Sequence, residues 1–255
     1  MRAALNRRQG GRGGGRRGGG GVPAAWAPST STLTNLRGWY RADLGITLVG
    51  ADVDAWADQS GVGNHLTAAA AGNRPLYVAT GFNGGTKPYV EFDVAAATEY
   101  LRKTAFSWGG TAGPYTVALV LKVLTVGAST DRLFTYSAAA TRPAVDLGSG
   151  VTRFYNSVGG PTLTGTTNIT TAYRSWVFWC DGTDAKTYVN NVQNATVAIS
   201  PGTFAADGAQ LALASSTGGA SYCNMQIAEF VVMRSAMSAA ERLSFDDYAS
   251  TRYGV

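Results

Sequence analysis

Short runs of alternating apolar and polar residues fill most of this sequence and limit what it can fold into. Clusters of Gly, Asn, Asp and Thr separate the runs. Because successive side chains of a β-strand point to opposite faces, such runs are typical of half-buried strands joined by turns. The strands predicted in this way lie near Trp39 and Val90, and over 115–124, 132–137, 152–157, 175–181, 186–191, 210–215 and 225–233. The pattern predicts one antiparallel all-β sandwich.

One helix is expected, at the end of the chain. Ser238 and Glu241 have the spacing of a capping box, in which each residue hydrogen-bonds the backbone N–H of the other. An apolar stripe follows at helical spacing, and Gly254 ends the pattern. The stripe consists of Phe245, Tyr248, Ala249, Arg252 and Tyr253. We expect this stripe to pack against the sandwich as core.

The first 21 residues differ from the rest of the chain, because they combine arginine and glycine and contain no acid. The arginines are Arg2, Arg7, Arg8, Arg12, Arg16 and Arg17. The whole chain has 21 basic and 16 acidic residues, so removing these six arginines leaves 15 against 16. We interpret residues 1–21 as a cationic arm, disordered or ordered by a partner, and residues 22–33 as a Pro/Ser/Thr linker. We expect residues 34–255 to form the sandwich.

Two further features of the sequence are its targeting signals and its cysteines. The first arginines give way to glycine instead of an apolar run, so we expect no secretory signal of the usual form. The longest apolar run, Val117–Val126, contains Lys122 and has the length of a strand, so we expect no membrane span. Cys180 and Cys223 are too few for a disulfide framework, and we interpret both as buried free thiols.

Trp56 and Asp58 precede the turn at residues 60–64, and Phe92 and Asp93 end a later strand, in a pattern that resembles the laminin G-like jelly rolls of the concanavalin A-like lectin and glucanase superfamily. The resemblance covers roughly residues 35–255 and is carried by a Trp and an Asp before a Ser-Gly-x-Gly-Asn turn, a later Pro-containing strand and a Phe-Asp strand end. These are Trp56, Asp58, Ser60, Gly61, Gly63, Asn64, Pro75, Phe92 and Asp93. It implies a concanavalin A-like antiparallel jelly-roll sandwich.

The DQSGVGN turn allows two interpretations. The side chains of Asp58 and Asn64 can hydrogen-bond the amides of a tight turn. The same oxygens are weak candidates for a calcium site, but calcium takes six to eight oxygen ligands and the loop offers few acids. We therefore favour a structural turn and predict no cofactor.

Catalysis is not expected. Glucanases of the superfamily carry Glu, Asp and Glu at alternate positions, whereas Glu91 and Asp93 are followed here by Ala95. Retaining hydrolysis needs two carboxyl groups about 5–5.5 Å apart. Glu99 lies further along in an expected loop, and His65, the one histidine, offers no base for a serine or cysteine hydrolase.

Glycan binding is the function that the resemblance implies for the sandwich. A sugar stacks its apolar face on an aromatic ring while amide and carboxylate groups bind its hydroxyls. The aromatic and amide candidates near expected loops are Trp108, Tyr155, Asn156 and Tyr173. The strand tryptophans Trp39, Trp56, Trp176 and Trp179 are expected in the core.

Taken together, the arm and the sandwich suggest a virion protein released by lysis. We expect a non-enzymatic capsid decoration or tail-associated adhesin, with the arm fastened to capsid or tail proteins and the sandwich facing outward, where it coats the surface or binds surface glycans. It would be present as a homo-oligomer or as lattice-bound copies. One alternative is an icosahedral coat protein whose arm binds nucleic acid. Another is a free bacterial carbohydrate-binding protein.

Overall fold

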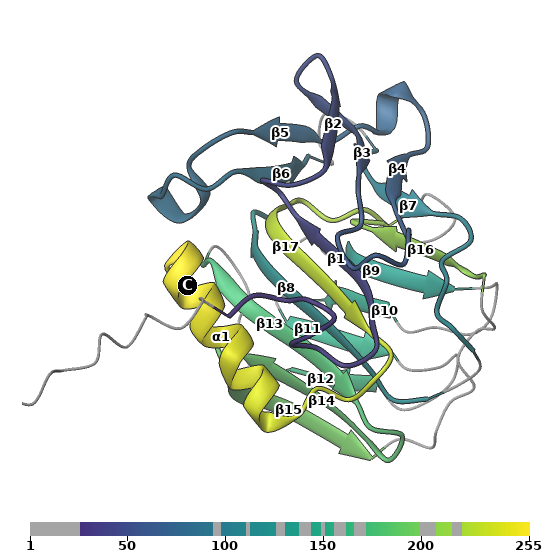
Figure 1. Ribbon diagram of the computed structural model, residues 1–255, viewed down its shortest axis with the longest axis vertical. Helices are drawn as coiled ribbons and strands as arrows, with labels where there is room; N and C mark the ends of the chain where they lie inside the picture. The colour runs from purple at the N-terminus through teal and green to yellow at the C-terminus, as the bar shows by residue number, and fades with distance from the viewer. Residues whose placement is uncertain are drawn as a thin grey trace, which may run out of the picture.

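Two antiparallel β layers pack face to face in the computed structural model (Figure 1). It describes residues 26–93, 98–110, 113–125, 131–137, 144–148, 151–155, 162–165, 172–198, 208–215 and 221–255. The layer that faces the viewer in Figure 1 contains β17. Its order is β1 (Leu36–Arg41), β17 (Met225–Met233), β8 (Tyr115–Val123), β13 (Arg174–Cys180), β14 (Asp184–Val189) and β15 (Val192–Ala198).

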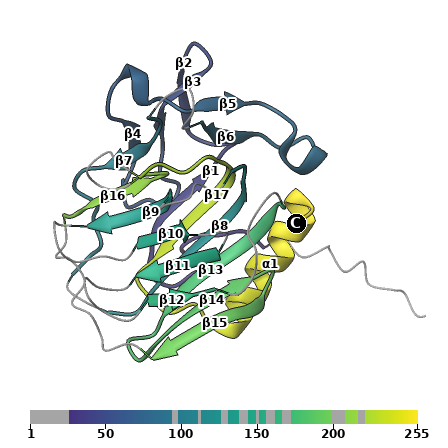
Figure 2. The same ribbon diagram turned by 180° about the vertical axis from the view of Figure 1, so that it is seen from behind.

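The second layer faces the viewer when the molecule is seen from behind (Figure 2). Its order is β12 (Thr162–Thr164), β11 (Val151–Tyr155), β10 (Ala144–Gly148), β9 (Asp131–Ser137), β16 (Gln210–Leu213) and β7 (Leu101–Lys103). Alternate residues of both layers meet in the core, as Leu119 and Leu121 of β8 and Trp176 and Phe178 of β13 do.

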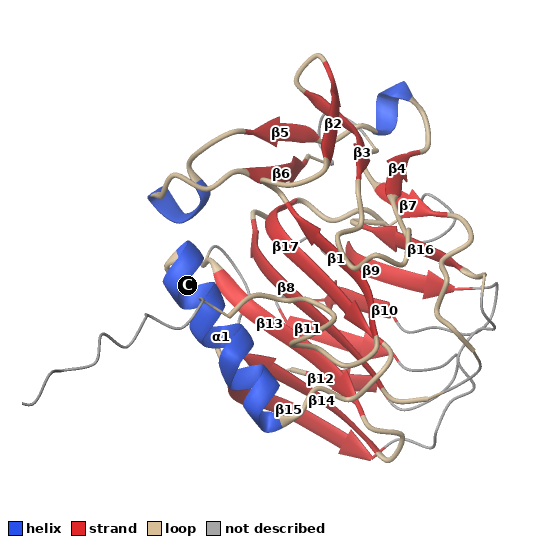
Figure 3. Cartoon of the chain, viewed as in Figure 1, coloured by secondary structure: helices blue, strands red, loops and turns tan. Residues whose placement is uncertain are grey.

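Five short strands and two 3₁₀ turns lie at one end of the two layers (Figure 3). They are β2 (Ile46–Val49), β3 (Asp52–Trp56), β4 (Leu66–Ala68), η1 (Ala71–Asn73), β5 (Leu76–Val78), η2 (Phe82–Gly84) and β6 (Tyr89–Phe92). β6 pairs antiparallel with β17, and β4 pairs with β7, so this end of the molecule is hydrogen-bonded to both layers. The expected all-β jelly-roll sandwich with a C-terminal helix is confirmed.

The helix α1 (Ala239–Tyr253) lies on the outer face of the β17 layer (Figure 1). Its capping box forms as expected: Ser238 Oγ accepts from Glu241 N at 3.2 Å, and Glu241 Oε2 accepts from Ser238 N at 2.7 Å. Gly254 ends the helix in a left-handed conformation, with φ at 71°. Four residues of the expected stripe are buried, namely Phe245, Tyr248, Ala249 and Tyr253. They pack with outward-facing residues of the layer, including Val120 and Val231.

The DQSGVGN turn is built around one buried carboxylate. Asp58 Oδ1 accepts from the backbone N–H of Trp39 at 2.9 Å and of Ser60 at 2.8 Å. Oδ2 accepts from Ser60 Oγ at 2.7 Å and from the N–H of Gly63 and Asn64 at 3.1 and 3.0 Å. Gly63 has φ at 85°, a conformation that a side chain disfavours. Both carboxylate oxygens are therefore engaged in the structural turn that the sequence predicts.

Part of the expected linker packs on the sandwich. Leu33 is buried, and Trp26 and Ala27 lie against the apolar cluster under α1. Residues 1–25, including the six arginines of the arm, lie outside the described part of the chain. Cys180 and Cys223 are buried free thiols, as expected. Within the described part, no helix has the length and apolar character that crossing a membrane requires.

We predict that Asp58→Asn destabilises the fold by about 2 kcal/mol or more, because an amide nitrogen replaces an oxygen that faces two or three buried donors. The measurement is the urea midpoint at constant m-value. Asp54→Asn is the matched control, since Asp54 makes a half-exposed ion pair with Arg74 and its loss costs less than about 1 kcal/mol. Equal midpoints for the two variants would contradict the structural role of Asp58.

Candidate functional site

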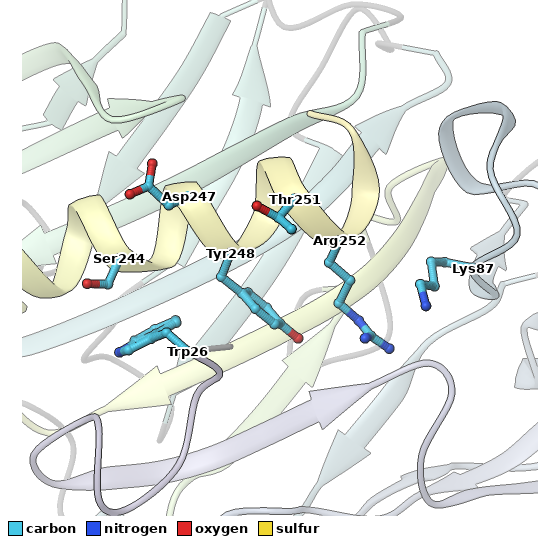
Figure 4. A pocket seen from close by; sticks show the side chains of 7 residues that line it. All are labelled: Trp26, Lys87, Ser244, Asp247, Tyr248, Thr251 and Arg252. Atoms are coloured by element: carbon cyan, nitrogen blue, oxygen red, sulfur yellow. The ribbon is translucent and has the colours of Figure 1, made fainter. Parts of the chain in front are cut away.

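A groove runs between α1 and the chain segment at Trp26. Its volume is about 420 Å³, within the size range of small-ligand sites. Figure 4 shows its lining, which comes from three separate parts of the sequence. The lining residues are Trp26, Lys87, Ser244, Asp247, Tyr248, Thr251 and Arg252. The groove is therefore made by tertiary packing and not by one contiguous motif.

Two aromatic rings form one end of the groove. Trp26 meets Tyr248 edge to face, with ring centroids 5.8 Å apart and an angle of 68° between the planes. Trp26 is only half-buried, whereas 9% of Tyr248 is exposed. The helix adds Ser244 and Thr251, whose hydroxyls can donate and accept hydrogen bonds. The combination gives an apolar surface flanked by small polar groups.

Beneath the groove, a buried glutamate holds the aromatic residues of α1. Glu229 on β17 is fully buried and accepts from Trp39 Nε1 at 2.7 Å, Tyr248 OH at 2.8 Å and Tyr253 OH at 2.7 Å. Burial raises the pKa of Glu229, while the three hydrogen bonds and the nearby charge of Arg41 oppose that rise. Because the Tyr248 hydroxyl is bound inward, the part of its ring that reaches the groove is fixed in position.

Two cations lie at the other end of the groove, where Figure 4 shows Lys87 and Arg252 close to each other. Arg252 pairs with Asp43, which also binds Arg41 Nε at 2.6 Å through its other oxygen. Burial works against the charged form of Asp43, but the hydrogen bond from Arg41 and the charge of Arg252 lower its pKa. Asp43 is thus a carboxylate shared by two arginines.

A second hollow adjoins the groove at this cationic end. Its volume is about 380 Å³, and it lies between the η2 turn and the C-terminal end of α1. Lys87 and Arg252 line both spaces. Asn83 ties the two walls together, because its Nδ2 donates to the carbonyl oxygens of Tyr253 and Gly254 at 3.1 and 2.7 Å.

The glycan candidates from the sequence fall in different environments. Only 1% of Trp108 is exposed, and its ring stacks on Tyr136 at 5.4 Å, so a sugar has no face of this ring to stack on. The structure therefore removes Trp108 from the surface candidates. Tyr155 belongs to β11, but its side chain lies outside the described part of the structure, as does all of Asn156.

Tyr173 is half-buried and belongs to a polar patch outside the groove. Its hydroxyl hydrogen-bonds Gln226 Oε1 at 3.0 Å, and Lys122 Nζ lies 4.8 Å from the centre of its ring. Phe82 packs against the same ring in a T-shaped arrangement, with the two ring centroids 4.7 Å apart. These contacts occupy much of the ring, so Tyr173 is a weaker platform for a sugar than Trp26.

The calcium candidates serve the fold. Asp58 is engaged as described, and Asn64 Oδ1 accepts from Ser107 N at 2.8 Å while its Nδ2 donates to Arg37 O at 2.7 Å. In the described ranges, no cluster of three or more His, Cys, Asp or Glu residues has a metal-binding arrangement. The donor atoms of Asp58 and Asn64 are thus directed at protein groups.

The acidic residues near β6 make separate hydrogen bonds. Glu91 Oε2 accepts from Gln226 Nε2 at 2.7 Å, and Glu99 Oε2 accepts from the N–H of Asp93 at 2.7 Å. Ala95, at the third position of the glucanase pattern, lies outside the described part. Burial raises the pKa of Glu99 to about 7, helped by the charges of Asp93 and Asp52 and opposed by the Asp93 hydrogen bond.

Little in the sequence indicates the groove. Trp26 stands in a segment that reads as linker, and Tyr248 belongs to a stripe that reads as core. A tryptophan within a Pro/Ser/Thr segment was the one local signal available. Lys87 sits in a glycine-rich turn with no signature of binding.

Comparison with known proteins identifies the fold family. The model of the concanavalin A-like lectin/glucanases superfamily matches residues 95–241, more than half of the chain. The groove residues lie before and after this range. No curated protein matches the chain in sequence.

Solved structures with the same fold include toxin and enzyme-associated domains. Domain 4 of AbnA, a GH43 extracellular arabinanase from Geobacillus stearothermophilus solved with arabinotriose, has a TM-score of 0.61 at 17% identity, covering 84% of this chain and 98% of that one. The binding domain of Paraclostridial Mosquitocidal Protein 1 gives 0.60 at 10% identity, covering 83% and 52%. The binding domain of botulinum neurotoxin serotype G gives 0.59 at 9%, covering 85% and 52%. The chain thus spans about half the length of the two toxin domains.

We predict that Glu99 titrates near pH 7 in the folded protein. An unfolded glutamate has a pKa of about 4.3, so folding favours the protonated form of Glu99. Its contribution to the free energy of unfolding is present at acid pH and is lost as the pH rises towards 7. A carboxyl ¹³C NMR titration, with Glu99→Gln to assign the resonance, measures the midpoint. A midpoint between pH 4 and 5 would contradict the burial of this carboxyl.

Proposed function

Because the chain belongs to the concanavalin A-like lectin/glucanase superfamily, we propose that it is a non-catalytic glycan-binding domain whose sugar site is the groove beside α1. The observation that carries the proposal is an open groove with Trp26 and Tyr248 at one end and hydroxyl groups along the helix. Ligand pockets combine an apolar or aromatic lining with a few placed polar groups, and this groove has both.

The arrangement of carboxylates supports binding over hydrolysis. Glycoside hydrolysis uses a pair of carboxyl groups on either side of the scissile bond. Among the described residues that line the groove, Asp247 is the one carboxylate. Glu91, the candidate from the glucanase pattern, is hydrogen-bonded to Gln226 on the polar patch outside the groove.

We predict that Trp26→Ala lowers glycan affinity by about five- to thirtyfold, since a stacked aromatic ring contributes on the order of 1–2 kcal/mol. The measurement is binding of the full chain to an array of neutral and acidic oligosaccharides. Leu243→Ala is the matched control, because Leu243 is an exposed apolar residue of α1 that does not line the groove. Unchanged binding in Trp26→Ala would place the site elsewhere, with Tyr173 the next residue to test.

We further infer that the arm gives the domain a second role, as the anchor of a virion component. The support is the charge distribution, since six arginines are gathered in residues 1–21 while the rest of the chain is close to neutral. In this proposal the arm fastens the protein to capsid or tail proteins and the sandwich carries the glycan site outward. The coat-protein alternative differs in making nucleic acid the partner of the arm.

Salt dependence separates these two roles of the arm. If all six arginines neutralise phosphates of duplex DNA, the slope of log affinity against log salt is about −0.9 times six, or roughly −5. For the anchoring role we expect weak binding to free DNA, and retention of the full chain on purified particles that is lost when alternate arm glycines become alanine. A slope near −5, with retention indifferent to the glycines, would favour the coat protein.

A further inference from the structure

We propose that the groove selects an acidic saccharide, whose carboxylate or sulfate group binds between Lys87 and Arg252 while its ring lies towards Trp26 and Tyr248. The inference rests on the proposed glycan site and adds the chemical class of its ligand. It starts from the two cations that line both the groove and the adjoining hollow.

Lys87 is one of the described cations that make no ion pair within the protein. Among the described residues, no ion pair joins its ammonium group to a carboxylate, whereas Arg41, Arg74, Lys186 and Arg252 all have carboxylate partners. Lys87 is half-buried beside the helix, and Figure 4 shows its side chain directed towards Arg252. A half-buried ammonium group next to another cation is best stabilised by an anion from outside.

Arg252 is fixed in position but not fully neutralised. Asp43 binds Arg252 and Arg41 together, so one carboxylate serves two guanidinium groups. The Nε of Arg252 also lies 3.2 Å from the Tyr253 hydroxyl, which is itself bound to Glu229. A guanidinium group has five N–H donors, so donors remain for an incoming acid group.

Asp247, the acidic residue that lines the groove, does not directly neutralise Lys87 or Arg252. Asp247 is exposed, and Figure 4 shows its carboxylate pointing away from both Lys87 and Arg252. The cationic end therefore presents positive charge while the far end presents Trp26. An acidic sugar, with a charged substituent on a ring that has an apolar face, matches this order of groups.

The junction of the two hollows provides room for more than one sugar unit. The groove measures about 420 Å³ and its neighbour about 380 Å³, and both reach Lys87 and Arg252. An acid group held at the junction would leave space on either side for the sugar that carries it and for the next residue of the glycan.

The test compares trigalacturonate with its methyl ester, which keeps the backbone and removes the charge, alongside an array of sialylated, sulfated and neutral oligosaccharides. The full chain is measured as wild type and as Lys87→Gln. Lys103→Gln on β7 is the matched charge control, and a variant with the six arm arginines changed to glutamine removes the arm's contribution. Binding is measured at about 150 mM salt, where exposed charges further apart than about 8 Å are screened.

We expect acidic members to bind at least about tenfold tighter than their neutral counterparts, and Lys87→Gln to remove most of that difference while Lys103→Gln keeps it. Equal binding of acidic and neutral glycans, with loss in Trp26→Ala, would overturn the acid preference and leave the proposed function intact. An acid preference that survives Lys87→Gln and disappears with the arm arginines would overturn it as well. No binding to any glycan would overturn the proposed function and this inference together.

Discussion

The carboxylate of Glu229 is buried on β17 and must find its hydrogen-bond donors inside the protein. An unpaired buried charge costs several kcal/mol, so these donors are a condition of the fold. They come from Trp39 of β1 and from Tyr248 and Tyr253 of α1. One side chain of β17 thereby joins a neighbouring strand and the helix at a single point. A capping box contributes only about 1 kcal/mol, so α1 depends on this contact and on the apolar cluster beneath it.

The hydrogen bond between Tyr248 and Glu229 also orders the surface of the groove. The Tyr248 hydroxyl donates its hydrogen bond to buried Glu229 and not to solvent. The edge of the ring that reaches the groove is therefore held in one orientation. Trp26 then rests on this fixed ring. At the other end, Arg252 Nε contacts the Tyr253 hydroxyl, and Asp43 binds another nitrogen of the same guanidinium group. A site that is already ordered loses less conformational entropy when a ligand binds. The fold and the groove therefore share their supporting residues.

The sequence was a good guide wherever a local pattern decides the structure. The strands over 115–123 and 225–233 carry near-continuous apolar runs, and the capping box and Gly254 mark both ends of α1. Strands β2 to β5 were not predicted, because they are short and half-exposed. Each contains too few residues for an alternation of apolar and polar side chains to be recognised. Trp108 was misjudged because its glycine-rich surroundings resemble a surface loop, whereas its ring packs on Tyr136 and Phe106. The hydrogen bonds of Glu229 and the groove both depend on contacts between residues that are far apart in the sequence. No local sequence pattern indicates such contacts.

The chain carries positive charge in the arm and in the groove, and salt affects anion binding at these two places differently. The arm holds six arginines within 21 residues, and contacts with a polyanion would release many counterions, so such binding weakens steeply with salt. The groove offers one lysine and one arginine in a half-buried setting, where solvent ions screen less than they do at an exposed surface. An acidic sugar in the groove would therefore keep most of its affinity at physiological salt, when binding to the arm has largely faded. If the groove binds an acidic sugar as proposed, the two basic regions would therefore differ in how steeply salt weakens their binding to anions.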